Sequence, residues 1–359
     1  MFHPFNLSAM GVTSSSLKVK ICASVCTIKL YKRIKYVHPI RVITLPVKDF
    51  EKQRKISQIQ STSMRFAAIE GGGTTWVCAI AENEVDNFVE RNVFETTDPA
   101  TTLAQVRTWL NSQKFDAIGI ASFGPIDAKI GSPTFGYITS TPKKLWANTN
   151  VLHLIGMNDE FKGVPFRFDT DVNAPALAEF NLHRQSNDAT SSAYITVGTG
   201  IGVGLVVNGS SVKGMMHPEA GHIQVKRSPG DTFAGTCPYH GDCVEGMCSS
   251  GALTARAHCT IHDLPGLPDD HEVWDTTAYY IAQLCSTLVM VASPEVICIG
   301  GGVLNRTTLY PRIHKHVLAQ LNGYITNPLL TEERIAEFIK PSFWFVHPCL
   351  FALFLSHKL

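Results

Sequence analysis

Apolar and polar residues follow two rhythms from position 64 onward. Runs of small and β-branched apolar residues that lead to glycine are typical of buried strands, and they occur in residues 64–82, 115–127, 191–209 and 294–305. Apolar side chains three and four positions apart predict helices in residues 101–113 and 276–293. Residues 166–184 are expected to be a strand that runs directly into a helix.

Strands and helices that alternate along a chain are typical of the α/β class. A strand, a glycine turn and a second strand occur near the start of each half, which indicates two lobes of related design. The predicted parts are a basic extension, disordered or a gene-model artefact (1–63), an N-terminal lobe (64–183), a C-terminal lobe (184–340) and an apolar tail broken by prolines (341–359).

Charge is distributed unevenly along the 359 residues. Residues 1–60 contain eleven Lys and Arg but two acids, so the remainder carries 31 − 11 = 20 basic and 30 − 2 = 28 acidic residues. A net charge of +1 excludes a protein that coats nucleic acid. No run of about 18 apolar residues predicts a membrane span. We expect a cytoplasmic protein without nucleic-acid or membrane partners. The basic, acid-poor start leaves organelle targeting as an alternative.

Three glycine-rich turns follow buried strands. Glycine lets a phosphate approach backbone N–H groups closely, and threonine adds hydroxyl donors. No Walker A lysine follows, and the second turn leads into a strand, so neither the P-loop nor the dinucleotide fingerprint applies. Plain hairpins are the alternative to a nucleotide site. The candidate phosphate-binding residues are Gly72, Gly73, Thr74, Thr75, Gly198, Thr199, Gly200, Gly301 and Gly302.

Polar residues lie where the predicted strand meets the helix in residues 166–184. Asp171 could be a general base for a hydroxyl nucleophile, with Asp169 as its local competitor. N-capping of the helix is the alternative for Asp171 and Asn173. Glu219 and Glu245 could accept hydrogen bonds from sugar hydroxyls, or could be solvent-facing loop charges.

A Cys-x2-His-x2-Cys motif lies in a loop rich in glycine and proline. Cys237, His240 and Cys243 offer thiolate and imidazole ligands that suit tetrahedral Zn²⁺, and His222 is the best-placed fourth ligand. Four protein ligands would make the site structural. A chance grouping of these residue types is the alternative.

Taken in order, these motifs resemble the ROK (repressor, open reading frame, kinase) sugar kinases, most closely the bacterial-type fructokinases. The resembling stretches lie between residues 64 and 306 and include AAIEGGGTTWVCAI, GIASFGPID, SPTFGYITSTPK, DTDVNAPALAE, VGTGIGVGLVVNG, HPEAGHIQVKR, CPYHGDCVEG and PEVICIGGGV.

The resemblance implies an actin-like ATPase (ribonuclease H-like) fold with an inserted zinc loop at residues 222–243. It implies ATP-dependent phosphorylation of a hexose at its 6-hydroxyl, most closely D-fructose to fructose 6-phosphate, by a homodimer that uses Mg²⁺. Asp171 would be the base, and the glycine turns would hold ATP. The implied sugar-binding residues are Asn173, Glu219, His222 and Glu245, and the implied zinc ligands are His222, Cys237, His240 and Cys243.

The chain departs from the family pattern at two places. Thr75 stands where the family usually has lysine, and residues 341–359 do not resemble the family's final glycine-rich segment and helix. An inactive variant that binds sugar and ATP is therefore an alternative. A mannose or glucose kinase is another, because these hexoses differ from fructose in hydroxyl placement around C1 and C2, and one loop residue can change the preference. A repressor would need an N-terminal helix-turn-helix, which residues 1–63 do not predict.

Overall fold

The computed structural model describes residues 18–21, 28–31, 63–84, 87–187 and 189–343. The chain divides into two units, Met1–Ser63 and Met64–Leu359. In the first unit, the described residues form two antiparallel strands, β1 (Lys18–Ile21) and β2 (Ile28–Tyr31). Most of the predicted disordered extension, and residues 344–359 of the apolar tail, lie outside the described residues.

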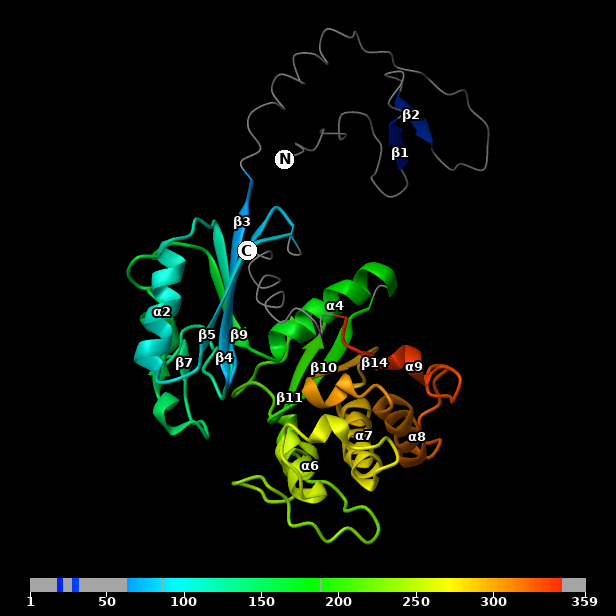
Figure 1. Cartoon of the computed structure of the whole chain (residues 1–359). Helices are drawn as coiled ribbons and strands as arrows, with labels where there is room; N and C mark the ends of the chain where they lie inside the picture. The colour runs from blue at the N-terminus through cyan, green and yellow to red at the C-terminus, as the bar shows by residue number, and fades with distance from the viewer. Residues whose placement is uncertain (1–17, 22–27, 32–62, 85–86, 188, 344–359) are drawn as a thin grey trace. The chain divides into compact units, whose positions relative to one another are not determined.

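The first sheet of the second unit contains the first glycine turn (Figure 1). Its strand order is β5-β4-β3-β6-β9, with β3, β6 and β9 parallel and β4 antiparallel to both of its neighbours. Helices α2 and α3 cover one face. The elements are β3 (Arg65–Gly71), β4 (Thr75–Glu82), β5 (Phe88–Glu95), α2 (Pro99–Asn111), β6 (Ala117–Ser122), β7 (Tyr137–Ile138), β8 (Thr149–Asn150), α3 (Val151–Leu154) and β9 (Phe166–Thr170).

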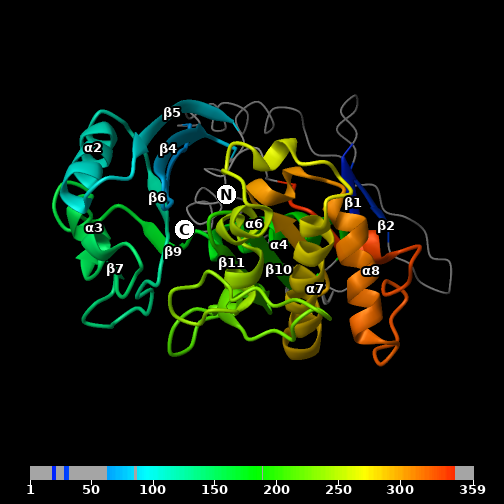
Figure 2. The same cartoon turned by 60° about the horizontal axis from the view of Figure 1, so that its bottom comes forward.

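The second sheet has the order β12-β11-β10-β13-β14 and repeats the antiparallel glycine hairpin beside a parallel strand. Helices α7 and α8 lie side by side on one of its faces (Figure 2). The elements are α4 (Asn173–Asn187), β10 (Ser191–Val197), β11 (Ile201–Val207), β12 (Ser210–Ser211), α5 (Val244–Cys248), α6 (Ser250–Ala257), α7 (Glu272–Ala292), β13 (Ile297–Gly300), α8 (Leu309–Leu321), α9 (Ile335–Phe338) and β14 (Ile339–Pro341).

Helix α4 is packed between the two sheets. One apolar cluster contains Phe66 and Ala68 of the first sheet, Ala174 and Phe180 of α4, and Tyr194 of the second sheet. Side chains along a strand point to alternate faces of the sheet. The residues of β3 and β10 next to those in this cluster therefore pack on the other face, in the clusters around α2 and α7 respectively. Alanine-rich α4 therefore fits where both faces are covered. The helix packs on β10 and β11, whereas the predicted lobe boundary at residue 183 would place it in the first lobe.

The predicted strand–turn–strand pairs at 64–82 and 191–209 are confirmed, as are the strand-to-helix segment and the helices that became α2 and α7. None of the helices in the described part of the chain is long and apolar enough to cross a membrane.

Gly204 provides a test of how tightly α4 is held. A Cβ on Gly204 would lie 2.0 Å from the Val172 carbonyl oxygen, so Gly204→Ala must push the start of α4 away from β11. We expect this variant to lose about 1–3 kcal/mol of unfolding free energy in urea titrations. Gly266→Ala is the control, because no atom lies within 4 Å of its added Cβ. Equal urea midpoints of unfolding for Gly204→Ala and Gly266→Ala would contradict a tight contact between Gly204 and Val172.

Candidate functional site

The ends of three parallel strands bring the first glycine turn next to Asp171. Gly71, Ser122 and Thr170 are in register across β3, β6 and β9. The Phe123 N–H donates to the Gly71 carbonyl (2.7 Å), and the Asp171 N–H donates to the Ser122 carbonyl (3.0 Å). Residues 100 positions apart in sequence therefore meet at one edge of the sheet.

Thr170 caps the first turn of α4. Its Oγ1 accepts a hydrogen bond from the Asn173 N–H at 2.9 Å. The N-capping alternative is therefore wrong for the side chains of Asp171 and Asn173, because the capping group is the threonine hydroxyl between Asp169 and Asp171. The Asp171 carboxylate is left free of that role.

Asp171 belongs to a cluster of carboxylates. Burial and, next, the nearby Glu219 raise the pKa of Asp171 to about 7, although His217 opposes the shift. Burial and then Asp171 raise the pKa of Glu70 to about 8. A carboxylate with a pKa near neutrality is suited to accept a proton from a hydroxyl. From the sequence alone, no role was assigned to Glu70 or His217, although Glu70 begins the EGGGTT motif and His217 begins the HPEAGH motif.

Asp169, the local competitor of Asp171, is occupied by other partners. It is 2% exposed and accepts hydrogen bonds from Asn173 Nδ2 (2.8 Å) and Ser211 Oγ (2.9 Å). Lys213 Nζ lies 2.8 Å from its second oxygen. Because these donors come from α4 and from the segment of β12, Asp169 links β9 to both. Asn173 is fully buried in this network, and its predicted contact with a sugar stays a prediction.

A cavity of about 480 Å³ opens beside this cluster. It is bounded on one side by the Pro125–Lys129 segment and on the other by Lys213 and His217. His217 Nε2 lies 2.9 Å from Glu219 Oε1, and the ring packs so closely on Gly124 that a Cβ there would be 3.2 Å from Nε2. The cavity therefore reaches His217, the residue that contacts Glu219.

The second and third glycine turns lie together. Gly301 has φ +93°, and a Cβ on it would lie 2.4 Å from the carbonyl oxygen of Val197, the residue before Gly198. Glu245 Oε2 accepts a hydrogen bond from the Ile201 N–H at 2.9 Å, and a Cβ on Gly200 would lie 2.7 Å from the same oxygen. Glycine is therefore required at these positions by close approach.

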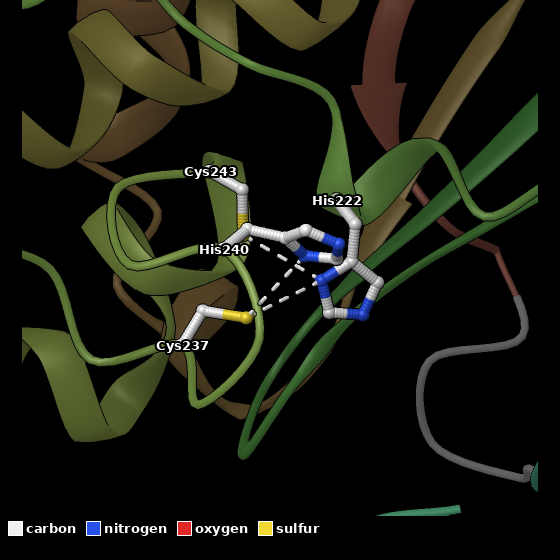
Figure 3. Close-up of side chains that lie close together, drawn as sticks. All are labelled: His222, Cys237, His240 and Cys243. Carbon is white, nitrogen blue, oxygen red and sulfur yellow. Dashed lines mark hydrogen bonds between the residues drawn. The ribbon is translucent and has the colours of Figure 1, made fainter. Parts of the chain in front are cut away.

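The four predicted zinc ligands converge (Figure 3). His222 Nδ1 lies 3.7 Å from Cys237 Sγ and 3.5 Å from Cys243 Sγ, and His240 Nδ1 lies 3.6 Å from Cys237 Sγ. A tetrahedral Zn²⁺ separates its sulfur and nitrogen ligands by about 3.6 Å. Burial raises the pKa of the Cys243 thiol to about 11, so a bound cation would be needed to hold it as thiolate at neutral pH. The donor set and its spacing fit zinc.

Ion pairs hold the loop that carries these ligands. Arg256 binds Asp231 at 2.8 Å, and Tyr280 of α7 donates a hydrogen bond to the same carboxylate. Together these donors lower the pKa of Asp231 to about 2, against the opposing effect of burial. Arg227 pairs with Asp242 at 2.8 Å. The loop therefore has anchors to α6 and α7 that do not depend on a metal.

Glu179, His183 and Cys298 form a second group of possible ligands, between α4 and β13. His183 Nε2 lies 3.6 Å from Cys298 Sγ, but Lys340 Nζ lies 3.5 Å from His183 Nδ1. Ser342 also donates a hydrogen bond to Glu179. Because Lys340 already supplies positive charge, this group needs no metal to balance its carboxylate.

The raised pKa values of the carboxylate cluster predict a pH-dependent stability. Glu70 and Asp171 have folded pKa values above their ordinary ones, so they stabilise the fold at low pH, and this contribution is lost as pH rises through about 7 and 8. We expect Glu70→Gln to unfold at higher urea concentration than wild type at pH 8, by on the order of 1–3 kcal/mol, and the gain to vanish near pH 4. A gain that is constant across this pH range would contradict the assignment.

The zinc ligands predict a metal-dependent loop. We expect wild type to retain about one Zn²⁺ per chain after dialysis, and Cys243→Ser to lose it with a lower melting temperature. Cys259→Ser, a cysteine outside the ligand group, is the control. Metal analysis by mass spectrometry checks this, and unchanged zinc content in Cys243→Ser would contradict it.

Comparison with known proteins agrees with this architecture. Residues 66–339 match the ROK family. The chain is 38% identical over 274 residues to a fructokinase of Lactococcus lactis subsp. cremoris, and the matched region covers 76% of this chain and 91% of that protein. It is 39% identical over 277 residues to a fructokinase of Streptococcus mutans, covering 74% of this chain and 89% of that protein.

Solved structures share the fold. A ROK family glucokinase from Streptomyces griseus in complex with glucose and AMPPNP has a TM-score of 0.63 at 17% identity, covering 83% of this chain and all of that one. A ROK hexokinase from Thermus thermophilus has a TM-score of 0.59 at 21% identity, covering 82% and 98%. The predicted two-lobed α/β fold of the actin-like ATPases is therefore confirmed. The protein belongs to the ROK family.

Proposed function

We propose that this protein is an ATP-dependent hexose 6-kinase, a fructokinase that converts D-fructose to fructose 6-phosphate. The observation that carries the proposal is Asp171, a carboxylate with a pKa of about 7 that is free of helix capping and lies beside a glycine turn. The naming of relatives at 38% and 39% identity as fructokinases supports fructose as the sugar.

Asp171 accepts the proton of the sugar 6-hydroxyl while the oxygen attacks the γ-phosphorus of ATP. Its raised pKa gives the carboxylate enough basicity for that transfer at neutral pH. The backbone N–H groups and hydroxyls of the glycine turns hold the phosphates in line with the oxygen. The protein therefore accelerates the reaction mainly by positioning and by stabilising charge.

The residues beside Asp171 fit a magnesium ion that accompanies ATP. Glu70 Oε2 is buried without a hydrogen-bond partner among the described residues, and carboxylate oxygens are ligands that Mg²⁺ favours. When bound, the ion neutralises charge on the phosphates. Glu70 and Asp171 are the side chains that would hold it, directly or through water.

Glu219, His222 and Glu245 would hold the sugar. Glu219 lies near enough to Asp171 to raise its pKa, so both face the same region. The two ring nitrogens of His222 divide its roles: Nδ1 faces the cysteine sulfurs, and Nε2 lies 4.0 Å from Glu245 Oε1. One histidine can therefore bind a structural zinc and still present a polar atom to a hydroxyl beside Glu245.

The homodimer and the cytoplasmic location remain predictions from the family resemblance. Light scattering of the purified protein tests the first. Mannose and glucose are the competing sugars, and a panel ranked by kcat/KM decides among the three.

Removal of the base tests the mechanism. We expect Asp171→Asn to lower kcat by about 10²–10⁴-fold while fructose binding, measured by calorimetry, persists. Asp159→Asn, an exposed aspartate paired with Arg107, should keep wild-type turnover. In wild type, kcat/KM should rise with pH through about 7 as Asp171 loses its proton. Sustained turnover by Asp171→Asn would overturn the base assignment.

A further inference from the structure

The first glycine turn contains no cation of its own. Residues Glu70–Thr75 offer backbone N–H groups and two threonine hydroxyls, and the charged group among them is a carboxylate. The turn is closed by a hydrogen bond from the Gly72 N–H to the Thr75 carbonyl at 2.8 Å. Phosphoryl transfer at this turn would bring several negative charges next to Glu70 and Asp171, which are themselves acidic. A positive side chain from elsewhere in the fold would offset that charge.

Lys143 is the side chain that reaches this turn. A Cβ built on Gly73 would lie 3.0 Å from Lys143 Cε and 3.9 Å from Nζ. The end of the lysine therefore lies against the backbone of the turn, 70 residues away in sequence. A larger residue at position 73 would collide with it.

An aromatic stack fixes the segment that carries Lys143. Trp146 is 1% exposed and stacks on Trp76, which directly follows the turn, with ring centroids 5.4 Å apart and planes at 14°. Trp146 Nε1 donates to the Thr97 carbonyl at 2.8 Å, and the Trp146 N–H donates to the Lys143 carbonyl at 2.7 Å. The backbone of Lys143 is thereby held to the same strand that leaves the glycine turn.

The Lys143 ammonium is available to a ligand. It is exposed, and no carboxylate lies within 4 Å of it in the part of the chain that the structure describes. Lys213, which also borders the site, is instead paired with Asp169. A free ammonium beside a glycine turn is a strong donor for phosphate oxygens.

We propose that Lys143 contacts the transferring phosphoryl group and supplies the positive charge that the first glycine turn lacks. This rests on the proposed kinase function. The bond from the γ-phosphorus to the β–γ bridging oxygen breaks, the bond to the sugar O6 forms, and the O6 proton passes to Asp171. Lys143 stays protonated and donates hydrogen bonds to the phosphoryl oxygens. Because these oxygens leave on the sugar, Lys143 also binds the phosphate of the product.

Replacement of Lys143 tests the charge. We expect Lys143→Met to lower kcat about 100-fold while the KM for the sugar changes little, since the contact forms with the transferring group. Lys143→Arg should keep part of the activity. Lys144→Met is the matched control, because Lys144 is the neighbouring exposed lysine and should leave kcat unchanged. The melting temperature of Lys143→Met should equal that of wild type, since the replaced ammonium is exposed.

Binding of the product gives a readout that needs no turnover. By calorimetry, Lys143→Met should bind fructose as wild type does and fructose 6-phosphate about tenfold more weakly, an effect that Lys144→Met does not share. If wild type is active and the kcat of Lys143→Met lies within twofold of the wild-type kcat, the role of Lys143 is overturned, but the proposed kinase function is not. A wild type that phosphorylates no hexose would instead overturn the proposed function, and equal fructose 6-phosphate affinity in Lys143→Met and wild type would then exclude phosphate binding by Lys143.

Discussion

The placement of Asp171 depends on how closely α4 is packed between two sheets. Alanine faces both sheets along the helix, and β11 presents glycine to it, so that the Val172 backbone nearly touches Gly204. Gly202 also lies close to Val172, because a Cβ there would be 2.5 Å from the valine side chain. Val172 follows Asp171 directly. The backbone of Asp171 is therefore fixed by the contact of Val172 with β11 on one side and by the hydrogen bond to Ser122 on the other.

The rigid placement of Asp171 beside other carboxylates costs electrostatic free energy, and the proposed chemistry depends on the same arrangement. Burial raises the pKa of both Glu70 and Asp171, and a neighbouring carboxylate adds to each shift, Asp171 for Glu70 and Glu219 for Asp171. Such a cluster would not form for stability alone, since like charges in a partly buried region oppose folding at neutral pH. The carboxylate cluster becomes favourable when a cation binds beside it or when a substrate gives it a proton. The carboxylate that stability explains is Asp169, which has four donors and holds the β9–α4 junction.

The glycine turns, the place of Asp171 between strand and helix, and the grouping of His222, Cys237, His240 and Cys243 could be predicted from sequence because most of each pattern is a local motif. Their partners could not, because they depend on contacts between distant segments. Lys143 meets Gly73 only through the stack of Trp146 on Trp76. The capping role of Thr170 was missed because aspartate and asparagine flank it and are equally good caps. Strand β5 was missed because most of its residues are exposed, so it lacks the apolar pattern of a buried strand. Helix α8 was missed because Pro311 usually signals a helix break, although proline is tolerated in the first turn, where it lies here.

Glu245 links the loop that carries the four predicted zinc ligands to the second glycine turn. It follows Cys243 by two residues, at the start of α5, and its carboxylate accepts the Ile201 N–H at the second glycine turn. The other carboxylate oxygen of Glu245 faces Nε2 of His222, and Nδ1 of the same histidine ring points at the cysteine sulfurs. A shift of the loop would therefore move the Glu245 carboxylate and the second glycine turn together. Arg256, Asp231 and Tyr280 anchor the loop to α6 and α7 without involving the four predicted zinc ligands, so the loop stays attached to the apolar core of α7 whether or not a metal is bound.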